Sequence, residues 1–93
     1  MAVARFSLGQ LVITPGAHDA FMSSLDDPAR YVLRHVSGDW GNLDAHDIAV
    51  NNLAVKEGDR ILSAYELSDK TRIWIITEWD RSVTTILLPD GAP

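Results

Sequence analysis

The fold is decided by residues 60–88, which read RILSAYELSDKTRIWIITEWDRSVTTILL. From Arg60 onward apolar side chains recur at about every second position, and Ile, Val, Thr, Tyr and Trp predominate, as is typical of β-strands. Two short polar segments divide the stretch into strands over residues 60–67, 72–78 and 83–88. Because such short loops join antiparallel neighbours, the pattern predicts a three-stranded antiparallel meander.

Helices are predicted ahead of this meander. Thr14, Asp27 and Asp44 are side chains of the kind that cap helix N-termini, and the first two are followed by proline. The predicted helices are a short one beginning at residue 15, one over 28–37 and one over 45–57. Residues 5–13 alternate and contain β-branched side chains, which predicts an N-terminal strand.

The predicted fold class is therefore α+β, with an N-terminal strand and three short helices packed on one face of the C-terminal meander. If the first hairpin loop holds four residues, Leu67 lies opposite Arg72, and the alternation assigns both faces of the sheet. The predicted core is Leu62, Ile73, Ile75, Ile86, Val32, Leu33, Ile48 and Leu53. We also expect Trp40 to anchor its glycine-flanked loop, and Asn52 to be buried and hydrogen-bonded.

Composition limits the classes of protein that fit. The 93 residues form one domain, 1–93, with residues 88–93 expected to fray as a tail. No cysteine is present, which excludes disulfides and thiolate metal sites. The first residues lack a targeting pattern and no apolar run is long enough to cross a bilayer, so we expect a cytoplasmic protein without membrane contact. A net charge of −5 opposes docking on phosphates, so direct nucleic-acid binding is not expected.

The second face of the predicted sheet mixes aromatic and polar side chains. We expect it to bind a partner, because tyrosine and tryptophan are enriched at binding surfaces. The predicted partner-binding residues are Tyr31, Tyr65, Trp74, Glu78 and Asp80. The alternative is that the N-terminal strand, the Trp40 loop or a second copy of the chain, forming a homodimer, covers this face.

An enzymatic interpretation is also open. His35, Glu78, Arg81 and Thr85 are the residue types of a metal-independent ribonuclease, in which a carboxylate removes the 2′-hydroxyl proton and a histidine returns one. The signal is weak, because these types are common and an Asp–Arg turn is usually a solvated ion pair. His46 and Asp47 lie near two further aspartates, yet no zinc spacing is present, so we expect neither a metal nor a cofactor.

Two segments carry a resemblance to known proteins: Gly38-Asp39-Trp40-Gly41, and Thr77-Glu78-Trp79-Asp80-Arg81-Ser82. Over residues 6–90 the chain resembles a family of small plasmid- and phage-related bacterial proteins. The resemblance implies a mobile genetic element as the origin and carries no catalytic residue. From it, together with the acidic and aromatic surface, we expect a non-enzymatic inhibitor of a host defence complex, similar in role to anti-CRISPR proteins. The expected partner is thus a protein within a nucleic-acid-handling complex, and the alternative is a ribonuclease of the barnase–RelE type that uses the open sheet face.

Overall fold

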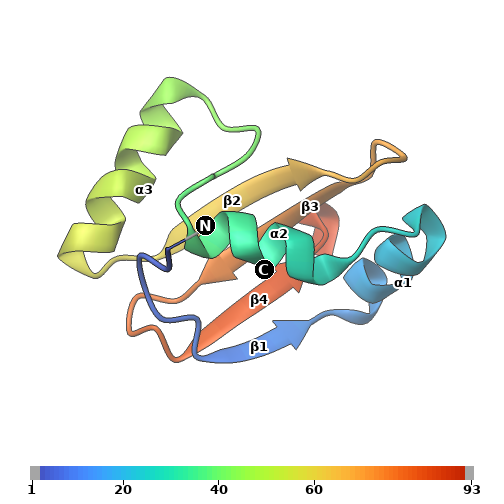
Figure 1. The fold of residues 1–93 in the computed structure, drawn as a ribbon, viewed down its shortest axis with the longest axis horizontal. Coiled ribbons are helices and arrows are strands. Elements are labelled where there is room, and N and C mark those ends of the chain that lie inside the picture. The colour runs from blue at the N-terminus through green and yellow to red at the C-terminus, as the bar shows by residue number, and fades with distance from the viewer. Residues whose placement is uncertain (1–2, 92–93) are drawn as a thin grey trace.

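The computed structural model describes residues 3–91 and shows an α+β fold with three helices and one four-stranded mixed sheet (Figure 1). The elements in chain order are β1 (Gln10–Ile13), α1 (Pro15–Ser24), α2 (Pro28–Val36), α3 (Ala45–Glu57), β2 (Ile61–Glu66), β3 (Arg72–Thr77), β4 (Val83–Leu87) and a short 3-10 helix, η1 (Pro89–Gly91). Part of the expected frayed tail is thus ordered as η1, and residues 92–93 lie outside the described part.

The sheet has the strand order β1-β4-β3-β2. Its C-terminal three strands form the predicted antiparallel meander. The prediction was incomplete at the N-terminal strand, because β1 joins the same sheet and runs parallel to β4, with Gln10 opposite Val83 and Ile13 opposite Ile86. The sheet is therefore mixed, and β1 and β2 are its two edges.

The helix starts are confirmed. The side chains of Thr14, Asp27 and Asp44 each accept a hydrogen bond from a backbone N–H two or three residues further along. Each cap thereby satisfies one of the free donors that a helix N-terminus leaves. These local signals predicted the helix boundaries well because they depend on neighbouring residues alone.

The register of the first hairpin differs from the predicted one by one residue. The N–H of Leu67 donates to the carbonyl of Thr71 at 2.8 Å, and Lys70 has a φ of 76°, so the loop holds three residues and Glu66, not Leu67, lies opposite Arg72. Three-residue hairpin loops of this kind end on a left-handed residue. A shift of one residue turns every side chain of a strand to the other face, so β2 was assigned backwards.

The side chains of β2 are consequently exchanged between the two faces. Ser63 and Tyr65 lie beneath the helices, and Leu62 and Ala64 lie on the opposite face. The main core is formed by side chains of α1, α2 and the three meander strands: Ala17, Phe21, Tyr31, Val32, Tyr65, Leu67, Ile73, Ile75 and Ile86. Figure 1 shows α2 lying across this face of the sheet.

The helices also bury faces other than those predicted. In α2 the buried side chains include Tyr31 and His35, whereas Leu33 is 58% exposed. Helix α3 lies beside the edge strand β2 instead of on the sheet (Figure 1), so Ile48 and Leu53 are 37% and 56% exposed. The core prediction is thus confirmed for Val32, Ile73, Ile75 and Ile86, wrong for Leu33, Ile48 and Leu53, and only partly right for Leu62, which is half-buried.

Trp40 is buried, as predicted, in a second small cluster with Ala54 and Ile61. Its indole N–H donates to the side-chain oxygen of Asn52 at 3.0 Å. Asn52 itself is exposed, so the prediction that it is buried was wrong. The neighbouring Asn51 is the buried amide.

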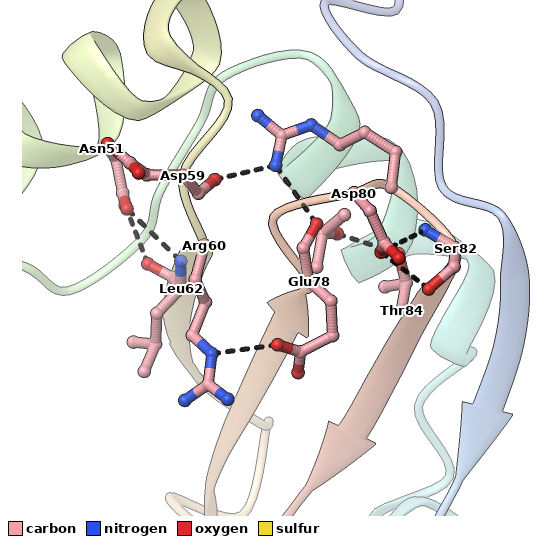
Figure 2. A network of polar contacts seen from close by, with 10 residues as sticks. Asn51, Asp59, Arg60, Leu62, Glu78, Asp80, Ser82 and Thr84 are labelled. Atoms are coloured by element: carbon pink, nitrogen blue, oxygen red, sulfur yellow. Dashed lines mark hydrogen bonds and ion pairs between the residues drawn. The ribbon is translucent and has the colours of Figure 1, made fainter.

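The β2 edge of the sheet is closed at Leu62 and Ala64 by hydrogen bonds from outside the sheet. The Asn51 side chain donates to the carbonyl of Leu62 at 2.7 Å and accepts from its N–H at 3.2 Å (Figure 2). The Ala64 N–H donates to the Trp40 carbonyl at 3.1 Å, and the Asn42 N–H donates to the Ala64 carbonyl at 2.6 Å. The backbone groups of Leu62 and Ala64 that point away from β3 are therefore all paired.

Candidate functional site

The sheet face opposite α1 and α2 is the main candidate for a binding site. We call it the Trp74 face and define it by Leu62, Ala64, Trp74, Ile76, Thr85 and Leu87. Trp74 lies on the central strand β3, opposite Ala64 on one side and Leu87 on the other. Its side chain is half-buried, which leaves part of the indole available to a partner.

Three hollows open onto the Trp74 face, and Trp74 lines all of them. The first has a volume of about 340 Å³ and lies between α3, with Asp47 and Val50, and the sheet, with Leu62. The second, of about 220 Å³, reaches Asn42 and Arg72, and the third, of about 200 Å³, reaches Ile76 and Leu87. The tryptophan is therefore the wall that these hollows share.

Charged side chains surround the apolar centre. The Arg60 Nε lies 3.1 Å from the Glu78 Oε1 at one end of the face (Figure 2), and Arg72 lies at the other end. Asp47 borders the first hollow from α3. Arg60 is exposed and Glu78 is half-buried, so the pair contributes little to the stability of the fold and both charges remain partly accessible to a partner.

The predicted partner-binding residues lie in three different places. Trp74 and Glu78 lie on the Trp74 face as expected. Asp80 lies in the exposed β3–β4 turn, where it accepts hydrogen bonds from the hydroxyl of Ser82 at 2.6 Å and from its N–H at 3.0 Å (Figure 2). These hydrogen bonds lower the pKa of Asp80.

Tyr31 and Tyr65 were wrongly placed on the surface. Both are buried between α2 and the sheet, with ring centroids 5.5 Å apart. The Tyr65 hydroxyl donates to the carbonyl of Asp39 at 2.6 Å, and its burial raises its pKa. The Arg34 guanidinium lies 4.6 Å from the centre of the Tyr65 ring and binds the Asp39 carboxylate, so these tyrosines stabilise the loop after α2.

The residues of the ribonuclease hypothesis do not meet. His35 lies on the helix-covered side of the sheet and is 0% exposed, whereas Glu78 and Thr85 line a hollow on the Trp74 face. His35 thus lies on the buried face of α2. The Arg81 guanidinium is engaged in the fold itself, donating to the carbonyls of Ala54, Asp59 and Glu78 at 2.9, 2.7 and 3.1 Å.

His35 instead belongs to a buried polar chain that the sequence did not predict. Its Nδ1 lies 2.5 Å from the Ser63 Oγ, and its Nε2 lies 2.9 Å from the Thr77 Oγ1. The Thr77 Oγ1 is 2.7 Å from the Thr84 Oγ1, which donates to the carbonyl of Leu8 at 2.7 Å. The chain thus connects α2, all three meander strands and the N-terminal segment.

The hydrogen bond from Thr84 to the carbonyl of Leu8 determines where the protons lie along this series of hydrogen bonds. Because the Thr84 hydroxyl donates to Leu8, it accepts from Thr77, and the Thr77 oxygen accepts from His35 Nε2–H. Burial lowers the pKa of His35 to about 4, so the imidazole is neutral above that pH and carries its proton on Nε2. Nδ1 of the neutral ring then accepts from the Ser63 hydroxyl.

Once the register of β2 is known, the sequence points to this hydrogen-bond chain. With the observed register, Ser63, Thr77 and Thr84 all fall on the helix-facing side of the sheet, among Ile and Tyr side chains. Three hydroxyls on an otherwise apolar face require hydrogen-bond partners, and a histidine on the covering helix supplies them.

Within residues 3–91, no group of three or more His, Asp and Glu side chains lies close enough together to hold a metal ion. The helices of the same part of the chain are all too short or too polar to cross a membrane. Comparison with protein-family models, with curated proteins and with solved structures found no match for this chain.

Proposed function

We propose that the protein is a non-enzymatic binding protein that holds a protein partner on the Trp74 face. The observation that carries this proposal is a half-buried tryptophan on the central strand of the sheet face opposite α1 and α2, where it lines three hollows. Partly exposed apolar hollows of this kind are typical of interaction sites, and tryptophan is enriched among interface hot spots.

The surroundings of the face favour a protein over a small molecule. Apolar hollows ringed by Arg60, Arg72, Asp47 and Glu78 reproduce the apolar centre and polar rim of a protein interface. The net charge of −5 favours association with a basic partner surface. Together with the resemblance to plasmid- and phage-related proteins, this supports a host defence complex that handles nucleic acid as the partner, with inhibition of that complex as the role.

Replacing Trp74 with alanine is expected to weaken partner binding by about 30-fold, because losing a central tryptophan typically costs about 2 kcal/mol or more. The partner would be identified by capture from a host lysate, and the dissociation constant measured by calorimetry with the purified partner. Trp79, which lies in the β3–β4 turn and is 66% exposed, provides a matched control. Trp79→Ala should bind like the wild type, and equal losses in the two variants would contradict the proposed site.

The ribonuclease alternative gives a separate expected result. Purified protein should not cleave a mixed-sequence RNA, because the sheet separates His35 from Glu78. Cleavage would be followed by gel electrophoresis for the wild type, Glu78→Gln and His35→Ala. RNA cleavage by the wild type that both substitutions abolish would replace the binding proposal with the nuclease.

A further inference from the structure

Strand β1 presents an open edge of the sheet. The N–H of Gln10 donates to Ser82 and the N–H of Thr14 donates to Ile86, so the even-numbered residues direct their backbone groups towards β4. Because successive residues of a strand point in opposite directions, the N–H and C=O groups of Leu11 and Ile13 point away from β4. Within residues 3–91, Figure 1 shows no helix or strand beyond β1 on that side.

The two edges of the sheet are built differently. The β2 edge is closed by Asn51 and by the Trp40 loop, as described above. The β1 edge lacks two of the usual protections against strand pairing, since Gln10–Ile13 contains no charged residue and no proline. Three of its four side chains are apolar, and Leu11 and Val12 are 51% and 38% exposed.

The charge distribution indicates which partner this edge accepts. Residues 6–17 contain no charged side chain, and this is the longest such stretch in a chain with 13 acidic and 8 basic residues. Two acidic molecules repel one another over most of their surfaces, and repulsion is weakest where such a neutral segment meets its own copy. Identical strands are also self-complementary when they pair antiparallel about a two-fold axis.

We propose that two copies of the chain pair through β1 to form a dimer with a continuous eight-stranded sheet. One antiparallel register pairs every backbone N–H and C=O group of β1 that points away from β4. In this register Leu11 lies opposite Ile13 of the partner subunit, and Val12 lies opposite Val12 of the partner subunit. Leu11 and Ile13 of each copy then exchange N–H···O=C bonds, which gives four bonds across the interface. The two-fold axis is perpendicular to the sheet, so both Trp74 faces lie on the same side of the dimer.

The edge is short, which limits the affinity. A pair of four-residue strands buries far less than the roughly 1,200–2,000 Å² of a stable protein interface. The dimer should therefore dissociate reversibly, with a dissociation constant in the micromolar range or weaker. It also leaves the Trp74 face free, so dimer formation and the proposed partner binding are independent of one another.

Sedimentation equilibrium of the full chain over a range of concentrations tests the proposal. The average mass should rise with concentration from 10.2 kDa towards twice that value. Val12→Lys places two like charges opposite each other at the two-fold axis and should weaken association at least ~10-fold. Leu53→Lys is the control, because Leu53 is an exposed apolar residue on α3, far from the β1 edge in sequence, and it should associate like the wild type.

Hydrogen exchange of the wild type gives a readout that needs no variant. The amides of Leu11 and Ile13 should exchange rapidly in dilute protein and become protected as concentration rises. The amides of Gln10 and Thr14, which are already bonded within the subunit, serve as internal references. A monomer up to about 1 mM, or association that Leu53→Lys abolishes and Val12→Lys does not, would overturn the proposal.

Discussion

Replacing Gly41 with alanine is expected to destabilise the protein by about 4 kcal/mol or more, a large part of the stability of a domain this size. Gly41 has a φ of 77°, and a β-carbon added there would lie 2.0 Å from the carbonyl oxygen of Ala64 and 2.6 Å from the Tyr65 ring. Neither neighbour has room to move, since one is strand backbone and the other is buried. The Trp40 loop would therefore have to separate from β2.

Gly58 provides the matched control for this experiment. It also has a φ of 77°, but a β-carbon there would meet nothing within 4 Å. Gly58→Ala should consequently lose only the left-handed backbone preference of glycine, about 1 kcal/mol. Urea unfolding of both variants separates the steric contribution from the conformational one, and equal losses would show that the loop does not press against β2 as closely as described.

Acidification should weaken the fold through His35. Its pKa is lowered from 6.5 to about 4 in the folded state, so between these values the unfolded chain binds a proton that the folded chain does not. The free energy of unfolding should accordingly fall as the pH decreases from about 6.5 to 4, by about 3 kcal/mol in total, and His35 should contribute no further loss below pH 4. The pKa values of Asp26, Asp39, Asp69 and Asp80 are lowered by the hydrogen bonds they accept, so these carboxylates protonate below that range.

Urea unfolding at a series of pH values measures this effect. His46 is exposed, so His46→Gln should retain the full decrease, whereas His35→Gln should lose it even if it starts from a lower stability. The nitrogen chemical shifts of the His35 ring in the wild type should report the neutral Nε2–H form down to about pH 4. A His35 ring that titrates near pH 6.5 would disprove the closed hydrogen-bond chain.

The parts of the fold that depend on adjacent residues could be predicted from the sequence. Thr14, Asp27 and Asp44 cap helices because their side chains reach N–H groups only two or three residues away. The first hairpin could not be predicted in register, because its loop length depends on Lys70 adopting a left-handed conformation that lysine seldom takes. That single residue decided which side chains of β2 face the helices.

The one-residue error in the predicted register of β2 also affected the prediction of the candidate site. Trp74 and Glu78 lie on β3 and the turn after it, whose faces were assigned correctly, and they were found on the expected face. Tyr65 lies on β2 and was therefore placed on the wrong side of the sheet. The bonds between His35 and its partners span 28 and 42 residues, and such contacts follow from the packed fold and not from local pattern.

The closed β2 edge has a consequence for how the protein behaves at high concentration. In the language of polymer chemistry, a sheet with two open edges is a bifunctional monomer and can add further molecules without limit. In this molecule the backbone groups of Leu62 and Ala64 at the β2 edge are already paired, so strand pairing uses the β1 edge. The molecule is thus monofunctional, and growth of the sheet stops once a second molecule has been added. Asn51 and the Trp40 loop thus act as a chain stopper that prevents an apolar edge strand from seeding fibres.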